Sequence, residues 1–241
     1  MWQNTEGIVL RTVKCAGGSV ILDVYTALRG RAQYSIGKGS RTRTCRGAAN
    51  MPLSLIELEA DVRPHTSVQR LKELKLCYSP LDYPFHPVKC AVAIFISELL
   101  VRVLKEEEPN PALYAFLRES IFVLDHCQRG MANFHLAFML RLARYLGIFP
   151  NLLGYAPGAL FSLSEAEYLS PQGSDQEGCL PADESRWLPL LSRMHYQNMH
   201  RFVMNRDQRN RCLSLMMDYY HHHLPGMGTV RSVEVLQQLF V

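Results

Sequence analysis

Residues 7–25 of the chain read GIVLRTVKCAGGSVILDVY. Two short runs rich in Val, Ile and Leu flank Gly17 and Gly18, a pattern that predicts two antiparallel strands joined by a hairpin. Three more strand-like runs follow, at residues 31–36, 53–58 and 67–76, although the last contains KELK and could equally be helical. Five short strands with glycine-rich turns in about eighty residues favour a small closed β-barrel, plausibly an OB-fold.

A proline-rich link separates this expected barrel from the rest of the chain. The sequence SPLDYPFHP at residues 79–87 contains Pro80, Pro84 and Pro87. Neither the interior of a strand nor the interior of a helix accepts proline at this density. We therefore expect a domain boundary here, with an OB-fold nucleic-acid-binding domain at residues 1–80 and an α-helical domain at residues 81–241.

The second part of the chain has the periodicity of helices. Helix-like stretches lie at residues 88–107, 111–126, 133–146, 183–194, 206–224 and 232–240. Asn110, followed by Pro111, and Asn205 are expected helix N-caps, and Gly147 is an expected C-cap. Residues 150–184 are rich in Gly, Pro and Ser and predict an irregular insertion. The expected fold class is an α+β multidomain protein, in which a five-stranded OB-fold β-barrel precedes an all-α helical domain.

Positive charge is concentrated in the first third of the chain. Up to Pro80 the sequence has 12 Lys and Arg against 6 Asp and Glu, a balance of +6, and from Leu81 onward it has 14 against 16, a balance of −2. Residues 29–46, RGRAQYSIGKGSRTRTCR, contain no acid, and two glycines flank Lys38. Glycines let a backbone approach a partner closely, so this run favours binding to a polyanion. A merely solvated hairpin is the alternative.

The candidate nucleic-acid contacts in this stretch are its cations and one aromatic ring that could stack on a base. They are Arg29, Arg31, Tyr34, Lys38, Arg41, Arg43 and Arg46. Tyr25 is a second stacking candidate, although a place in the barrel core explains it more simply. A second basic cluster consists of Arg201, Arg206, Arg209 and Arg211. Arg206 and Arg209 share one helical face, and the unfavourable placing of cations at a helix N-terminus slightly favours a second polyanion contact.

No sequence motif indicates catalysis or a resident metal. The sequence lacks G-x-S-x-G, a P-loop and H-E-x-x-H, so we assign no catalytic residue and expect no enzyme activity. The adjacent histidines at residues 221–223 would point about 100° apart on a helix and could not converge on one ion. We therefore expect neither a metal nor a cofactor.

The sequence also shows no membrane span. The most apolar run, residues 88–104, contains Lys89, Glu98 and Arg102, which argues against a transmembrane helix. The first residues do not have the pattern of a signal peptide. Seven scattered cysteines, none in a C-x-x-C pair, are typical of free thiols in a reducing cytoplasm.

Five stretches, in order and spacing, resemble the bacterial DNA repair and recombination family RecO. They are GIVLRTVKCAGGSVILDVYTALRG at 7–30, GKGSRTR at 37–43, EEEPNPALYAFL at 106–117, ANFHLAFMLRLARYLGIFPN at 132–151 and YYHHHLPGMGTVRSVEVLQQLF at 219–240. The resemblance implies an OB-fold followed by a helical domain. It also implies a non-enzymatic mediator that binds single- and double-stranded DNA and anneals complementary strands.

The family also implies partners and a location. Such a mediator works with RecR to load RecA onto DNA coated by single-stranded DNA-binding protein. The C-terminal tail of that protein is a further expected contact. The expected location is the cytoplasm, in association with the nucleoid. Some members carry a four-cysteine zinc module, but the region after Pro150 retains only Cys179, so zinc is not expected here. Two alternatives stay open on the residues alone: a protein–protein adaptor with a peptide-binding barrel or helical groove, and an RNA-binding OB protein.

Overall fold

The computed structural model describes residues 2–15, 19–36, 51–63, 66–105, 107–169 and 178–239. The chain forms two compact units. Unit 1 comprises Met1–His126 and Val230–Leu239, and unit 2 comprises Cys127–Thr229. The division differs from the expected boundary after residue 80 because several helices pack with the barrel in unit 1. The two domains at residues 1–80 and 81–241 stay a prediction.

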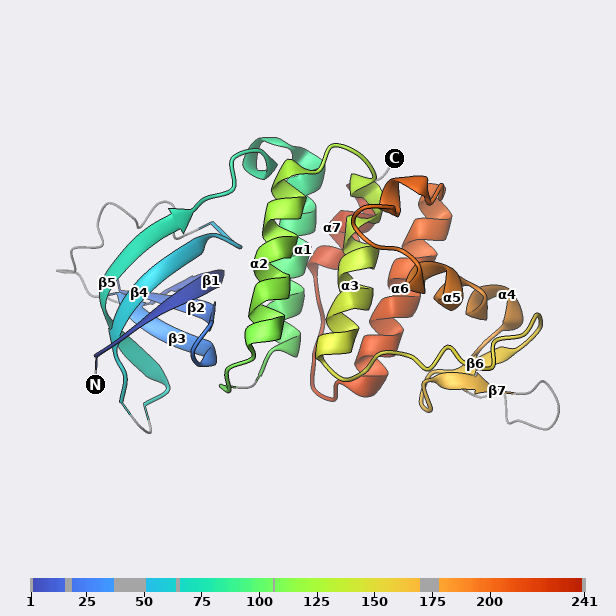
Figure 1. The fold of residues 1–241 in the computed structure, drawn as a ribbon, viewed down its shortest axis with the longest axis horizontal. Helices are drawn as coiled ribbons and strands as arrows, with labels where there is room; N and C mark the ends of the chain where they lie inside the picture. Colours follow the sequence, from blue (N-terminus) through green and yellow to red (C-terminus); the bar gives the residue numbers. More distant parts are fainter. Residues whose placement is uncertain are drawn as a thin grey trace. The chain divides into compact units, whose positions relative to one another are not determined.

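A closed five-stranded barrel forms the first part of unit 1 (Figure 1). Its strands are β1 (Trp2–Lys14), β2 (Val20–Thr26), β3 (Gly30–Ile36), β4 (Leu55–Asp61) and β5 (Val68–Tyr78). They close in the order β1-β2-β3-β5-β4, with β3 parallel to β5 and every other pair antiparallel. A Greek-key barrel of five strands is the OB arrangement. The predicted barrel is confirmed, and residues 68–78 form a strand rather than a helix.

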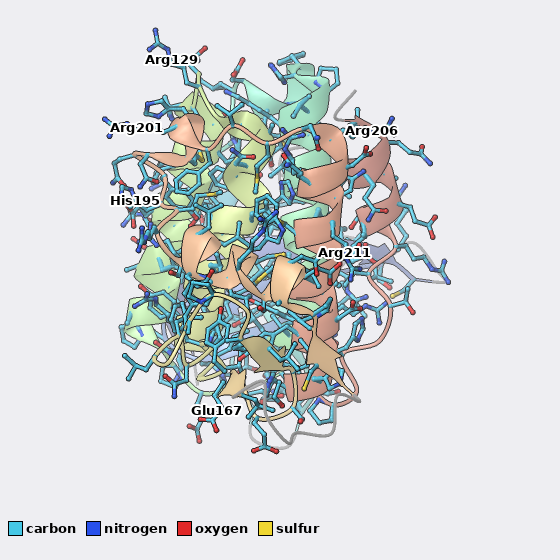
Figure 2. All side chains as sticks on the ribbon, turned by 90° about the vertical axis from the view of Figure 1, so that its right-hand side faces the viewer. Arg129, Glu167, His195, Arg201, Arg206 and Arg211 are labelled. Carbon is cyan, nitrogen blue, oxygen red and sulfur yellow. The ribbon has the colours of Figure 1, made fainter. Side chains whose placement is uncertain are left out.

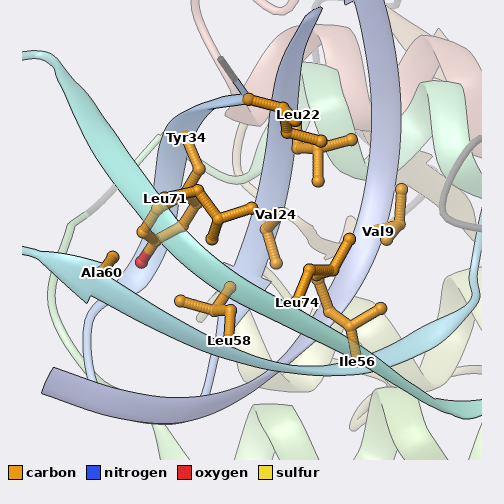
Figure 3. Close-up of a cluster of buried hydrophobic side chains, with 10 residues drawn as sticks. Val9, Leu22, Val24, Tyr34, Ile56, Leu58, Ala60, Leu71 and Leu74 are labelled. Atoms are coloured by element: carbon orange, nitrogen blue, oxygen red, sulfur yellow. The ribbon is translucent and has the colours of Figure 1, made fainter. Parts of the chain in front are cut away.

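Alternate residues of the strands fill the barrel interior (Figure 3). The buried cluster consists of Val9, Leu22, Val24, Tyr34, Ile36, Ile56, Leu58, Ala60, Leu71 and Leu74. Space is tight near Gly7, because a Cβ atom there would lie 2.5 Å from Cγ1 of Val24. A side chain at that position would therefore displace the core.

Three helices complete unit 1: α1 (Pro87–Val103), α2 (Pro111–His126) and α7 (Ser232–Leu239). A short 3₁₀ turn, η4 (Tyr83–Phe85), precedes α1. The side chain of Asn110 accepts a hydrogen bond from the backbone N–H of Leu113 at 2.9 Å, which confirms the predicted N-cap. The hydroxyl of Ser97 on α1 donates to the carbonyl of Leu10 on β1, and this contact ties the helix to the barrel.

Unit 2 is mainly helical, as predicted. Its elements are η5 (Met131–Asn133), α3 (Phe134–Tyr145), β6 (Leu160–Ser162), β7 (Glu167–Leu169), β8 (Cys179–Leu180), α4 (Ala182–Ser185), α5 (Trp187–Ser192), η6 (Met199–Arg201) and α6 (Arg206–His223). The segment expected to be an irregular insertion includes a small sheet in the order β7-β6-β8. Asn205 and Gln208 form a capping box at the start of α6, and Gly147 follows α3 in the left-handed conformation, with φ +72°. Both predicted helix ends are thus confirmed.

Buried tyrosines join the two long helices of unit 2. The hydroxyl of Tyr220 on α6 donates to the carbonyl of Met139 on α3 at 2.6 Å, and that of Tyr219 donates to the carbonyl of Ile148 at 2.7 Å.

Within the described ranges, no helix combines the length and the apolar character needed to cross a lipid bilayer.

Candidate nucleic-acid interface

Strand β3 begins within the basic stretch at residues 29–46 and ends at Ile36. Arg29 lies in the turn before β3 and Arg31 near its start, whereas residue 37 follows its end. Seven residues of strand span roughly 20 Å at about 3.3 Å per residue. The four remaining predicted contacts, Lys38, Arg41, Arg43 and Arg46, lie outside the described residues.

Arg31 is engaged by partners within unit 1. Its Nε donates to Asp23 at 2.8 Å and its second guanidinium nitrogen, Nη2, donates to the same carboxylate at 2.7 Å. Its Nη1 donates to the carbonyls of Val101 and Leu104, at 2.6 and 2.7 Å, at the C-terminal end of α1. Because Asp23 is only 1% exposed, these bonds hold a buried carboxylate. Arg31 thus joins barrel and helix, and its role as a DNA contact stays a prediction.

Tyr34 also has a structural position. Its side chain lies within the barrel core, with 0% exposed surface (Figure 3), so its ring cannot stack on a base. Burial raises the pKa of the phenol, and the nearby Arg29 guanidinium only partly offsets this effect. Tyr25 is buried as well. The predicted stacking role of Tyr34 is therefore wrong, and neither Tyr34 nor Tyr25 is exposed enough to stack on a base.

Arg29 is half-buried in the turn between β2 and β3. Its backbone N–H donates to the hydroxyl of Thr26 at 3.1 Å, and that hydroxyl donates to the carbonyl of Gly30 at 3.0 Å. The turn is thus held by Thr26, and Arg29 lies at the opposite end of β3 from residue 37. A role of Arg29 in DNA binding stays a prediction.

Other cations lie at the end of the barrel where β3 leads into residues 37–50. Lys14 is opposite Val20 on β2, and Val20 is opposite Ile36, so the end of β1 lies level with the end of β3. Arg70 on β5 is opposite Ser35 on β3. Lys14 and Arg70 are both exposed. Arg70 thus lies on the strand next to the end of β3 and Lys14 lies two strands from it, although 56 residues of sequence separate the two cations (70 − 14 = 56), and we did not predict either from the sequence.

A third cation lies beside Arg70. Asp61 on β4 is directly opposite Arg70, and its carboxylate accepts hydrogen bonds from Nε and Nη2 of Arg63, both at 2.8 Å. Arg63 itself is 66% exposed in its side chain. We call Lys14, Arg63 and Arg70 the cationic end of the barrel. Strand β3 ends at Ile36, one residue beyond the partner of Arg70.

An acidic hollow borders the cationic end along β1, β4 and β5. It has a volume of about 450 Å³ and is lined by Asn4, Thr5, Glu6, Glu57, Leu58, Glu59, Glu73 and Lys75. Two of its carboxylates have partners, since Lys72 lies 2.6 Å from Glu59 and Lys75 lies 3.2 Å from Glu57. The excess of carboxylates repels phosphates. The floor of this hollow itself is therefore unfavourable for a phosphate.

The second predicted basic cluster, in unit 2, separates into exposed and internal members. Arg201 and Arg206 are exposed and point away from the unit in Figure 2. Arg209 turns inward, where its Nε donates to the Asn133 side chain at 3.2 Å and Nη2 to the Met204 carbonyl at 2.9 Å. Arg211 forms a two-bond ion pair with Glu184 at 2.6 and 2.5 Å. Arg209 therefore holds unit 2 together, and a joint DNA contact of Arg206 and Arg209 stays a prediction.

Unit 2 also has a cationic pocket that the sequence did not indicate. Arg141 and Arg144 line a hollow of about 540 Å³ between α3 and α5, together with His195. The guanidinium of Arg141 lies 4.9 Å from the ring centroid of Tyr196, and that of Arg144 lies 4.0 Å from the ring of Phe149. Cation–π contacts of this kind hold arginines in fixed positions.

No catalytic or metal site emerges from the described part of the chain. His135 is completely buried, and burial lowers its pKa to about 3, with a further decrease from Arg209. Within the described ranges, no group of three or more His, Cys, Asp and Glu side chains could hold a metal ion. Six described cysteines are free thiols, including Cys179.

The described geometry defines a class of protein. It is a two-part protein in which a closed five-stranded barrel of the OB type is followed by a helical region. Two family models match the chain: recombination protein O N-terminal over residues 1–80 and recombination protein O C-terminal over residues 85–231. The chain therefore belongs to the RecO family of DNA repair proteins.

Curated relatives agree over the full length. The chain is 42% identical to the DNA repair protein RecO of Bacteroides fragilis over 242 residues and to that of Phocaeicola vulgatus over 241 residues, each comparison covering 100% of both chains. The RecO protein of Porphyromonas gingivalis is 30% identical over 241 residues, with 98% of each chain covered.

Proposed function

We propose that this protein binds single- and double-stranded DNA with little sequence preference and anneals complementary strands. The observation that carries the proposal is the convergence of charge at one end of the barrel. Arg70 is opposite Ser35 near the end of β3, and Lys14 and Arg63 lie two strands away on either side; the acid-free stretch of sequence at residues 37–50 follows β3. That segment adds four further cations: Lys38, Arg41, Arg43 and Arg46.

The chemistry of this surface suits annealing. Two DNA strands repel each other, and a protein that lowers this repulsion must not hold either strand in one register. Cations that contact phosphates satisfy both conditions, because phosphate contacts carry no sequence information. The exposed members of the cationic end are lysine and arginine side chains, which bind phosphates through charge.

Contacts with partner proteins complete the proposed activity. We propose that the protein works with RecR to help load RecA onto DNA coated by single-stranded DNA-binding protein, and that it binds the C-terminal tail of that protein. It acts as a mediator by binding and not as an enzyme, in the cytoplasm and in association with the nucleoid.

A hollow of about 450 Å³ in unit 2 supports such protein contacts. Its lining includes Leu190, Phe202 and Val203 together with the cations Arg193 and Arg201. Val203 is 95% exposed. Apolar surface next to positive charge is complementary to a peptide that combines apolar and acidic groups.

Binding of a fluorescent single-stranded oligonucleotide at several salt concentrations tests the DNA part. If some four phosphates are neutralised, log affinity falls against log salt with a slope near roughly −2.8, at ~0.7 per contact. A triple variant, Lys38→Ala with Arg41→Ala and Arg43→Ala, should reduce the steepness of this slope by about 2 and weaken both binding and annealing. A flat salt response of the parent protein would refute the electrostatic interpretation.

A matched triple variant in unit 2 serves as the control. Arg129→Ala with Arg201→Ala and Arg206→Ala removes the same charge from exposed side chains and leaves the internal Arg209 intact. We expect a much smaller loss of DNA affinity than in the barrel variant. If the unit 2 variant instead loses annealing while the barrel variant retains it, the DNA site lies in unit 2. A parallel titration with RNA of the same sequence decides the RNA-binding alternative.

A further inference from the structure

One aromatic side chain on the barrel points away from the core. Trp2, at the start of β1, is 51% exposed. Tyr34 and Tyr25 are buried in the same barrel. An indole ring that is open to water exposes a large apolar surface, and tryptophans with this exposure are common where a partner binds. The position of Trp2 relative to the cationic end indicates which partner that is.

Strand register places Trp2 in one row with Arg70 of the cationic end. Trp2 is opposite Asp61 on β4, Asp61 is opposite Arg70 on β5, and Arg70 is opposite Ser35 on β3. Residues directly opposite each other on adjacent strands project from the same face of a sheet. Trp2 and Arg70 are both exposed, so the row lies on the outer face of the barrel. It lies at the level where β3 leads into the basic segment.

Lys72 brings a further cation to the ring itself. Its ammonium group lies 4.9 Å from the centroid of Trp2 and 2.6 Å from the Glu59 carboxylate. The cation–π contact and the ion pair together position the indole from one side, while half of its surface stays open. An aromatic ring with cations beside it is the combination that single-stranded nucleic acid binds, because bases stack on the ring and phosphates meet the cations.

We propose that Trp2 is a stacking platform for an unpaired base of single-stranded DNA, with Arg70 and Lys72 contacting the flanking phosphates. This inference rests on the proposed function and assigns it a specific contact. Stacking accepts any base, since every base has a π-face, so Trp2 adds affinity without adding sequence preference. Bases within a duplex already stack on their neighbours. Trp2 therefore favours single strands over double strands at a surface whose cations alone would bind both.

Affinity measurements on Trp2 variants test the proposal. Trp2→Ala should weaken binding of a single-stranded oligonucleotide about 5- to 150-fold, the equivalent of about 1–3 kcal/mol per stacked base. Binding of a duplex should change far less, and the salt slope should stay the same because no charge is lost. Trp2→Phe should retain most of the affinity, whereas Trp2→Leu, which is apolar but cannot stack, should behave like Trp2→Ala. Phe85→Ala is the matched control, since Phe85 is an exposed aromatic residue of unit 1 (87%) outside this row.

Fluorescence gives a direct signal from the ring. The sequence has two tryptophans, Trp2 and Trp187, so Trp187→Phe leaves Trp2 as the sole tryptophan. Addition of unlabelled oligothymidine should quench the emission of this variant in step with binding measured independently by anisotropy. The proposal is overturned if binding saturates without quenching, or if Trp2→Leu binds single strands as tightly as Trp2→Phe. If the parent protein binds no DNA at all, the proposed function fails first, so the two failures are distinguishable.

Discussion

Arg31→Met should destabilise the protein strongly while leaving the DNA affinity of the folded state nearly unchanged. The substitution keeps an unbranched apolar stem but removes all four guanidinium bonds described above. It leaves the Asp23 carboxylate, which is 1% exposed, with Arg11 as a remaining partner at 3.0 Å. The two carbonyls at the end of α1 lose their donor as well.

The magnitude follows from what the substitution removes. Removing one partner of a buried ion pair typically costs 3–5 kcal/mol, because the remaining charge stays buried. Arg11 still compensates part of the Asp23 charge, and the carbonyl of Leu104, at the end of a helix, can accept from water instead. We therefore expect a loss of about 3 kcal/mol, toward the lower end of that range. Replacing Asp23 by Leu in the same protein removes the stranded charge and should recover part of this loss.

Urea denaturation of the parent, of each single variant and of the double variant measures these differences in the free energy of unfolding. Oligonucleotide titration at a urea-free condition where each variant is folded measures DNA affinity separately. The structural interpretation of Arg31 is refuted if Arg31→Met unfolds at the same urea concentration as the parent but binds DNA severalfold more weakly. That result would return Arg31 to the role that the basic stretch predicted.

Three further predictions concern other parts of the protein. Burial alone would raise the pKa of Asp125, but the Tyr78 hydroxyl and the N–H groups of Leu81, Asp82 and Tyr83 outweigh it and hold the pKa below its ordinary value. Asp125→Asn should therefore lower the free energy of unfolding by about 2 kcal/mol at pH 7. The difference in unfolding free energy between variant and parent should disappear as the pH falls below about 4, because the carboxylate of the parent is then protonated. A difference that does not change with pH contradicts this prediction. Glu98 accepts hydrogen bonds from the N–H groups of Arg231 and Ser232 and from the Ser232 hydroxyl. Glu98→Ala should therefore accelerate amide hydrogen exchange in α7 and lower the free energy of unfolding by about 1 kcal/mol. Unchanged exchange would show that the cap is dispensable. Elemental analysis of the purified protein should find no stoichiometric zinc, and about one zinc per chain would reveal a site that includes residues outside the described ranges.

Local signals in the sequence predicted the elements well. Asn110 and Asn205 marked helix starts because an N-cap acts through its own backbone neighbourhood, within three residues. The strand runs of the barrel were visible because their alternate residues enter the core. The segment before Gly7 was missed as a strand, since β1 there reads WQNTE. It pairs with β4 without contributing a run of apolar residues, so the pattern of hydrophobic alternation does not predict a strand there.

The candidate site was harder to predict because it depends on contacts that are distant in sequence. Arg31 and Arg209 look like any other cation in a basic run. Their partners come from positions 70 and 76 residues away, namely Val101 and Asn133, and only the tertiary structure supplies them. Lys14 and Arg70 lie on β1 and β5, and only the strand register shows which of their neighbours on β2 and β3 they lie opposite. Charge counting alone therefore cannot separate the cations that bind inside the protein from those that face solvent.

The assignment of α7 to unit 1 has a consequence for synthesis of the protein on the ribosome. Leu236 of α7 is fully buried and Ser232 binds Glu98 on α1, yet all of residues 127–229, which form unit 2, are translated between α1 and α7. At bacterial rates of 5–20 residues per second, roughly 5 to 20 s pass before the helix that covers this face of α1 leaves the ribosome. During that interval the nascent barrel and its first helices expose apolar surface that the mature protein conceals. Early release of a truncated chain would leave the same surface uncovered permanently, as a target for chaperones and proteases.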